Sequence, residues 1–384
     1  MCVVRELKRV LVTGNEAIAE GAIAAGCNFY VGYPITPSSE IMHYMAEKLP
    51  RINGVFFQAE DELAAINIAI GASWGGARVM TATSGPGFSL MQEGIGYAVM
   101  TETPLVIVNV MRVGPATGQA TKPAQGDLMQ SRWGRHGDQV IPVLAPESPQ
   151  EAFELTVKAF AIAEELRVPV ILLSDEIIAH MREVIELPNY ESIKIPDRRK
   201  PMSIDETPFG SKDPRIAPPM PSLGEGYYVL VTGSTHNEWG YRDTRSFETH
   251  YKLLKRLWNK VWLNINRIFE YEAYHVDDAD VGFVAFGSTA RSVKMAVKIL
   301  KEKGVKAGFV RLKTLWPLDL KPIRNLCGVC KVVIVPELSL GQLVLDVERA
   351  NEGNAKVIRY GKIGGGELIY PRELVKIALE EVKS

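Results

Sequence analysis

The sequence has 384 residues, 46% hydrophobic and 23% charged, which is the composition of a globular protein with two or three domains. A net charge of −1, with no basic run, gives no electrostatic reason to expect nucleic acid or an anionic membrane as a partner. With neither a signal peptide nor an apolar run of roughly 20 residues, the sequence predicts a soluble, cytoplasmic protein.

The first half of the chain alternates short apolar runs with longer helical stretches. The predicted strands are 28–33, 55–58, 78–82, 105–110 and 170–174, and the predicted helices are 16–25, 37–49, 61–73, 88–100 and 151–166. Leu63, Ile66 and Ile70, for example, recur at helical spacing. Strand–helix alternation predicts a parallel sheet covered by helices.

Residues 187–225 are rich in proline, which predicts an extended connector rather than a folded core. A run suited to strand pairing follows at 227–232, and 243–257 is predicted to be helical. Strands at 281–286, 305–312 and 331–336 then indicate a second, smaller α/β domain. We therefore expect a first domain at 1–187, a connecting region at 188–265 and a second domain at 266–384.

The segment 32–40, GYPITPSSE, follows a predicted strand and opens a helix. Thr36 can cap that helix, and Pro37 suits its first turn, where no amide donor is needed. Ligands of parallel sheets bind beyond the carboxyl ends of the strands, and a helix start there offers free amides to an anion. Thr36 is therefore either an anion contact or only a cap.

The segment 58–65, QAEDELAA, also joins a strand to a helix. Acidic residues in a first turn suit the helix dipole, and two of the three acids need no other role. Glu60 comes first, where the strand ends, and we expect it to face the interior. Desolvation would then raise its pKa and let it share a proton with a ligand nitrogen.

The segment 83–88, TSGPGF, has two glycines around a proline, which allow a tight turn and close approach of a ligand to the backbone. It has no lysine and is not a P-loop. Arg112 lies just after the predicted apolar strand 105–110, where its guanidinium can bind a carboxylate with two hydrogen bonds. An ion pair with a neighbouring acid is the alternative.

Two other features have no assigned role. His136 lies two residues before Asp138, and a lone histidine near an aspartate is more often structural than catalytic. Cys327 and Cys330 lack the second pair that a zinc site would need, so we expect them to fill space beside the strand at 331–336.

Taken in this order, YPITPS (33–38), QAE (58–60), SGPGF (84–88) and RxGPxTG (112–118) resemble the α subunit of 2-oxoacid:ferredoxin oxidoreductases. The likeness is close over 13–183 and weaker over 281–343. It is greatest to the 2-oxoglutarate enzymes, although the branched-chain 2-oxoacid enzymes share the opening motif. Ala116 stands where serine is usual in the family, and Val113 where glycine is common.

This resemblance implies a parallel-sheet thiamine diphosphate pyrimidine-binding domain followed by a smaller transketolase C-terminal-like α/β domain. Glu60 would be the catalytic residue that activates the pyrimidine ring, and Ser84, Gly85 and Gly87 would also contact the cofactor. Thr36 and Arg112 would bind the carboxylate of the 2-oxoacid. We expect no metal site in this chain.

The family signature for the diphosphate and Mg²⁺, Gly-Asp-Gly, is absent, because neither Gly126-Asp127 nor Gly137-Asp138 is followed by glycine. The four cysteines are also not spaced for an iron–sulfur cluster with four thiolate ligands. By resemblance, a β subunit carries Mg²⁺, the diphosphate half of the cofactor site and the [4Fe-4S] cluster. Further γ and δ subunits are possible partners.

The expected reaction is CoA-dependent oxidative decarboxylation of a 2-oxoacid, with 2-oxoglutarate as the first choice and ferredoxin as electron acceptor. A branched-chain 2-oxoacid or pyruvate is the alternative substrate. A chain that keeps the fold only as a structural subunit is the alternative of another class. A stand-alone thiamine decarboxylase is disfavoured by the missing diphosphate motif.

Overall fold

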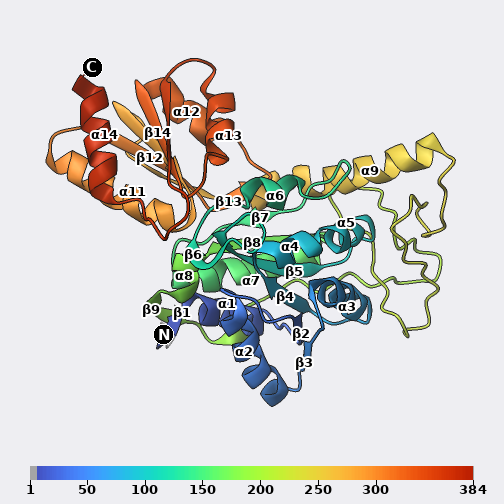
Figure 1. Cartoon of the computed structure of the whole chain (residues 1–384). Coiled ribbons are helices and arrows are strands. Elements are labelled where there is room, and N and C mark those ends of the chain that lie inside the picture. Colours follow the sequence, from blue (N-terminus) through green and yellow to red (C-terminus); the bar gives the residue numbers. More distant parts are fainter. Residues whose placement is uncertain (1–6, 384) are drawn as a thin grey trace, which may run out of the picture.

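The computed structural model describes residues 7–383, and Figure 1 shows them as a larger lobe and a smaller lobe that holds the C-terminus. Most of the larger lobe is built on one mixed sheet. From edge to edge its strands are β13 (Thr314–Trp316), β7 (Val143–Leu144), β8 (Pro169–Asp175), β5 (Leu105–Val113), β4 (Val79–Thr83), β2 (Phe29–Gly32) and β3 (Val55–Gln58). From β7 to β3 neighbouring strands are parallel, whereas β13 and the short β6 (Gln119–Pro123) pair antiparallel with β7 and β5.

Helices of 5 to 18 residues and one 3₁₀ turn cover this sheet. They are α1 (Gly14–Ala24), α2 (Ser39–Lys48), the 3₁₀ turn η1 (Leu49–Ile52), α3 (Glu62–Trp74), α4 (Gly85–Leu90), α5 (Gln92–Met100), α6 (Leu128–Trp133), α7 (Pro149–Leu166) and α8 (Glu176–His180). The start of α1 is fixed by a capping box, because Thr13 Oγ1 accepts from the Glu16 amide and the Glu16 carboxylate accepts from the Thr13 amide. A separate antiparallel ribbon joins β1 (Lys8–Thr13) to β9 (Arg182–Leu187).

The smaller lobe is a second α/β unit with its own five-stranded sheet. The strand order is β10 (Tyr271–Tyr274), β12 (Ala307–Leu312), β11 (Val281–Ala285), β14 (Val332–Glu337) and β15 (Lys356–Gly361), parallel except for β10. Its helices are α11 (Gly287–Glu302), α12 (Lys321–Val329), α13 (Leu343–Asn351) and α14 (Pro371–Lys383). One strand of this part of the chain, β13, leaves the smaller lobe and completes the edge of the large sheet.

The connecting region contains the 3₁₀ turn η2 (Tyr190–Ser192), the long helix α9 (Phe247–Trp262) and the short α10 (Ile265–Ile268). Between η2 and α9 the chain has no regular helix or strand, as its prolines predict. In Figure 1 this stretch lies along the side of the larger lobe away from the C-terminal lobe. It is nevertheless anchored, because Phe209 and Met220 are buried against the larger lobe.

The parallel sheet predicted from the sequence is confirmed, and the five predicted strands of the first half correspond to β2, β3, β4, β5 and β8. Three details were wrong. Residues 227–232 form no strand. The helix predicted at 88–100 is two helices, α4 and α5, which meet at Met91. The helix predicted from Pro37 begins only at Ser39.

Candidate active site

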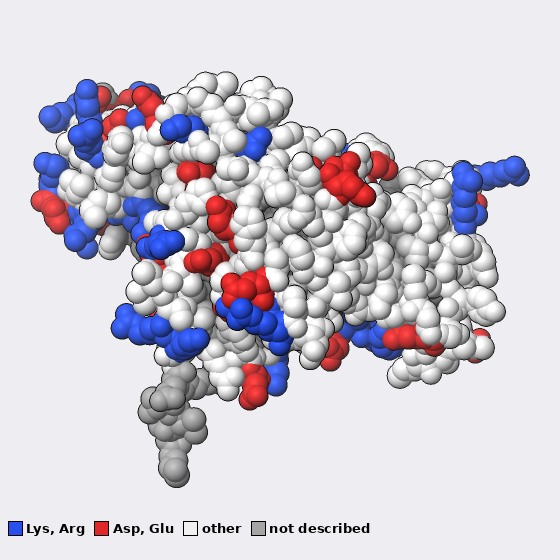
Figure 2. Space-filling model, turned by 60° about the horizontal axis from the view of Figure 1, so that its bottom comes forward, with Lys and Arg blue, Asp and Glu red and all other residues white. Residues whose placement is uncertain are grey.

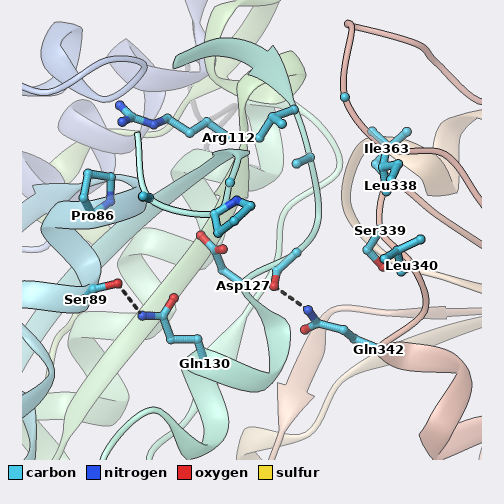
Figure 3. Close-up of a pocket in the computed structure, with 18 residues that line it drawn as sticks. Pro86, Ser89, Arg112, Asp127, Gln130, Leu338, Ser339, Leu340, Gln342 and Ile363 are labelled. Carbon is cyan, nitrogen blue, oxygen red and sulfur yellow. Dashed lines mark hydrogen bonds between the residues drawn. The ribbon is translucent and has the colours of Figure 1, made fainter. Parts of the chain in front are cut away.

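A cavity of about 470 Å³ lies between the two lobes, at the carboxyl end of β5 and the start of α4. Figure 3 shows that the larger lobe contributes Pro86, Arg112 and Asp127 to one wall. Leu338, Leu340 and Ile363 form the opposite wall, from loops after β14 and β15. The cavity therefore exists only because the two lobes are docked.

Arg112 ends the buried run of β5, and its side chain is 5% exposed. Its Nη1 donates to the Thr36 carbonyl oxygen at 2.7 Å, and its Nη2 donates to the Thr117 carbonyl oxygen at 3.1 Å. Its Nε is buried and has no hydrogen-bond partner among residues 7–383. No carboxylate in this part of the chain forms an ion pair with the guanidinium, so the predicted alternative of a neighbouring ion pair is not what the structure has.

Thr36 lies beside Arg112 but is not the helix cap that the sequence suggested. A turn closed by the Ser38 amide and the Ile35 carbonyl oxygen, 2.9 Å apart, precedes α2, so Ser38 occupies the cap position. This turn contains Thr36 and Pro37, which were predicted to begin the helix. It is the Thr36 carbonyl oxygen that holds Arg112, and the Thr36 side chain is exposed.

Ser84 is the N-cap residue between β4 and α4, and Gly85, Pro86 and Gly87 form the first turn of α4, which fits tightly among polar side chains. A Cβ on Gly85, where φ is +47°, would lie 2.8 Å from Arg112 Nε. A Cβ on Gly87 would lie 2.2 Å from both Glu62 Oε1 and Thr83 Oγ1. Both glycines are therefore required by close approach. Ser84 is fully buried, and its Oγ has no partner among the described residues.

Glu60, the first acid of the QAEDE segment, is exposed at the carboxyl end of β3, which corrects the expectation that it faces the interior of this chain. Asp61 is the N-cap of α3 and accepts from the Ala64 amide at 2.7 Å. The buried acid is Glu62, and desolvation is the main cause that raises the pKa of its carboxyl group. Glu60 lies between β3 and α3, whereas Glu62 begins α3, which packs against β2 and β4.

Asp127 is a cavity residue that the sequence did not single out as a site residue. Its carboxylate accepts from Asn109 Nδ2 at 2.9 Å, and desolvation raises its pKa despite that bond. Gln342, on the other lobe, donates to the Gly126 carbonyl oxygen (Figure 3) and also accepts from the Met129 amide at 2.8 Å. The only hint in the sequence that Asp127 belongs to the site is that it follows Arg112 closely. The contact with Gln342 joins residues far apart in the chain and leaves no local pattern.

The remaining candidates lie away from this cavity. His136 is exposed near Glu93, with 3.8 Å between Nδ1 and the carboxylate. Cys327 and Cys330 are buried free thiols, and Cys330 Sγ lies 3.0 Å from where a Cβ on Gly282 of β11 would be, which agrees with the prediction that they fill space. Among residues 7–383 no cluster of three or more His, Cys, Asp or Glu side chains could hold a metal ion. No helix in that same range is long and apolar enough to cross a membrane.

Comparison with known proteins identifies the class. Residues 20–256 match the thiamine diphosphate-binding domain of pyruvate flavodoxin/ferredoxin oxidoreductases, and residues 279–374 match core domain II of pyruvate:ferredoxin oxidoreductase. The chain therefore belongs to the α subunits of the 2-oxoacid:ferredoxin oxidoreductases, as the motifs predicted.

Within that family the chain is similar to proteins named 2-oxoglutarate synthase subunit KorA. The one from Methanocaldococcus jannaschii is 48% identical over 97% of this chain and 100% of its own, and the one from Archaeoglobus fulgidus is 46% identical over 97% and 99%. The ketoisovalerate oxidoreductase subunit VorB of Methanothermobacter thermautotrophicus is 37% identical over 95% and 96%.

Two solved structures are informative. The 2-oxoglutarate:ferredoxin oxidoreductase from Magnetococcus marinus, with 2-oxoglutarate, coenzyme A and succinyl-CoA bound, matches with a TM-score of 0.91 and 34% identity. That match covers 98% of this chain and 66% of the other, so this chain spans about two thirds of that longer one. An inactive split-gene transketolase matches over 97% and 98% of the two chains with a TM-score of 0.55 at 15% identity, which shows the fold alone.

Proposed function

We propose that this chain is the subunit that binds the 2-oxoacid and activates the pyrimidine ring in a CoA-dependent, ferredoxin-linked 2-oxoacid oxidoreductase, with 2-oxoglutarate as substrate. The observation that carries the substrate site is the state of Arg112. Its guanidinium is buried beside the cavity, yet its hydrogen bonds go only to backbone carbonyl oxygens. A buried cation without a hydrogen-bonded counter-ion is suited to an anionic ligand such as a carboxylate.

The choice of 2-oxoglutarate rests on the relatives. The names of the KorA proteins and the ligands of the Magnetococcus marinus structure refer to this substrate. The KorA proteins are 48% and 46% identical to this chain, compared with 37% for the ketoisovalerate subunit and 34% for the Magnetococcus marinus enzyme. A branched-chain 2-oxoacid or pyruvate remains the alternative. A panel of 2-oxoacids assayed on the assembled complex with a viologen acceptor distinguishes them by kcat/KM.

Thiamine diphosphate fits the residues at the turn after β4. Ser84 Oγ and Thr83 Oγ1 are buried without partners in the described part of the chain, and Gly85 and Gly87 bring the backbone close to Arg112, Glu62 and Thr83. Glu60 is exposed after the end of β3, which β2 separates from β4, and makes no hydrogen bond or ion pair with the described residues. When bound, the cofactor supplies the carbanion chemistry, while Glu60 of this chain would hold a proton at the ring nitrogen.

Exposure of Glu60 also supports a site shared with a second chain. Apolar side chains surround it on the edge of the sheet, where Val55, Phe57 and Leu63 are each about half exposed. Figure 2 shows wide parts of one face of the molecule without charged side chains. We infer that a β subunit covers this edge and carries the diphosphate, Mg²⁺ and the [4Fe-4S] cluster, with γ and δ subunits and ferredoxin as further partners.

We also propose the division into a pyrimidine-binding domain at 1–187, a connecting region at 188–265 and a transketolase C-terminal-like domain at 266–384. Two features support it: the parallel sheet of the first part and the separate five-stranded sheet of the last. One strand pairing joins the first and last domains, because β13 of the last domain pairs with β7 of the first.

The test uses the complex co-expressed with its β subunit. Arg112→Ala should raise KM for 2-oxoglutarate and lower kcat/KM about 100-fold, because losing a buried charged contact to a ligand costs roughly 2–5 kcal/mol. Glu60→Gln should lower kcat with less effect on KM. Arg51→Ala, an exposed arginine on η1, is the control and should match the wild type. Undiminished activity of the Glu60 variant, or no bound thiamine diphosphate in the complex, would favour a purely structural subunit.

A further inference from the structure

Two acidic side chains flank Arg112, and the proposed function gives neither of them a role. Glu62 is 4% exposed, and its Oε1 has no hydrogen-bond partner among residues 7–383. The Glu62 carboxyl group occupies the space where Gly87 would carry a Cβ, and the Arg112 guanidinium occupies the corresponding space at Gly85. The three-residue turn Gly85–Pro86–Gly87 therefore has the guanidinium on one side and the Glu62 carboxyl group on the other.

The second acid is Asp127, which lines the cavity together with Arg112. Asn109 Nδ2 fixes its carboxyl group, and the adjoining backbone is held from the other lobe by Gln342. No hydrogen bond joins Arg112 to Glu62 or to Asp127 in the described part of the chain. The three groups interact through space only, so a ligand can reach the guanidinium without displacing an ion pair.

The charges around this site are few. Glu62 is influenced by Asp61 of its own helix and by Arg112 from β5, and Asp127 is influenced by Arg112. For Arg112 the two acids are the opposing charges. Desolvation is the largest influence on both acids and raises the pKa of each, so the free site favours the protonated, neutral forms more than exposed carboxyls would.

We propose that Glu62 is a positioning residue of the substrate site, which acts with Asp127 to set, by its protonation state, how strongly Arg112 attracts the carboxylate of a 2-oxoacid. With both acids neutral, the guanidinium offers its full charge to the ligand. Each deprotonation adds a negative charge that competes with the incoming carboxylate. Substrate binding is then coupled to proton uptake. This inference rests on the proposed function of Arg112.

The test is the pH dependence of KM for 2-oxoglutarate in the assembled complex, at saturating CoA, between pH 6 and 8. For the wild type, KM should rise by about tenfold or more as pH rises, the order of magnitude expected when one unit of negative charge develops near a buried guanidinium. Glu62→Gln should reduce the rise and lower KM at pH 8. The double variant Glu62→Gln, Asp127→Asn should be flat. Glu93→Gln, which removes an exposed acid from α5, should keep the wild-type profile.

A flat wild-type profile, or an unchanged profile in Glu62→Gln and in the double variant, would overturn the inference. If Glu62→Gln does not assemble, as judged by circular dichroism and subunit stoichiometry, Asp127→Asn alone carries the same prediction. A failure of the proposed function is distinguishable, because Arg112→Ala would then leave KM unchanged. An effect of Arg112→Ala without any change of profile in the acid variants contradicts the role of Glu62 alone.

Discussion

At the scale of single residues, the turn after β4 can form only because Gly85 and Gly87 have no side chains. Side chains from α3, β4 and β5 occupy the space that any Cβ at Gly85 or Gly87 would need. The neighbours are buried polar groups, which are costly to displace into an apolar interior. Backbone and polar side chains are consequently packed together at the place where a cofactor and a carboxylate are expected to meet.

Gly87→Ala should therefore lower stability and activity together. The new methyl group would lie 2.2 Å from Glu62 Oε1 and Thr83 Oγ1, both on buried side chains, and overpacking of this kind costs about 1–3 kcal/mol. Chemical denaturation of the chain and kcat/KM of the complex measure the two effects. The control is Gly71→Ala in α3, where no atom lies within 4 Å of the added Cβ. That change should stabilise by up to about 1 kcal/mol, because alanine is the better helix former.

At the scale of elements, a buried charge cluster fastens α9 to the larger lobe. Glu102, which lies two residues after the end of α5 and has φ +50°, is fully buried, and Arg256 donates to its two carboxylate oxygens at 2.8 and 2.7 Å. Lys260 donates to the same carboxylate and to the Arg167 carbonyl oxygen. Arg167 in turn donates to the carbonyl oxygens of Pro208, Pro218 and Pro219 in the connector. The charge cluster around Glu102 thus holds both α9 and the irregular connector against the larger lobe.

Glu102→Gln should destabilise the chain by roughly 3–5 kcal/mol, since it leaves two cations without their counter-ion, one fully buried and one nearly so. The cations hold the pKa of Glu102 well below its usual range. Its contribution to stability is therefore complete above the unfolded value of about 4.3 and is lost as pH falls through the lower folded value. Urea unfolding between pH 3 and 7 should show this loss for the wild type and a smaller slope for the variant. Glu165→Gln, from an exposed pair with Arg267, should change little.

At the scale of the whole molecule, one buried glutamine holds the two lobes together beside the cavity. Gln125 Nε2 donates to the Phe286 carbonyl oxygen at 3.0 Å, and its Oε1 accepts from Thr289 Oγ1 at 2.6 Å and from the Leu338 amide at 3.2 Å. Its own amide donates to the Leu338 carbonyl oxygen at 2.8 Å. Arg132 and Asp346 form a further buried ion pair between the lobes. The cavity wall is thereby fixed by both halves of the chain.

Gln125→Leu should loosen this contact, because partners on the smaller lobe would stay buried without hydrogen bonds, at a cost of about 1–3 kcal/mol for each unpaired group. Calorimetry should show a lower Tm. Hydrogen exchange should become faster at 286–289 and 338–343 while it stays unchanged in β5. An equally low Tm in Gln150→Leu, whose glutamine bonds at the exposed start of α7, would show that the lobe contact is not the cause.

The sequence by itself determined the parallel sheet, the second α/β unit and the positions of Arg112 and the Gly85–Gly87 turn. These depend on local signals: alternating apolar runs, glycines at a strand end and an arginine directly after a buried strand. It could not identify Glu62 as the buried acid in place of Glu60, because three acids at the start of a helix are equivalent until packing decides which one points inward.

Only the tertiary structure decided how the lobes meet. The pairing of β13 with β7 joins residues more than 160 positions apart through two- and three-residue strands, which have no periodic signature. Gln125 and Gln342 are ordinary polar residues in the sequence, and each acquires its role from a partner in the other lobe. Local patterns thus fixed the elements and most of the candidate site residues. The cavity, the balance of charge around Arg112 and the anchoring of α9 depend on long-range contacts, which no local pattern encodes.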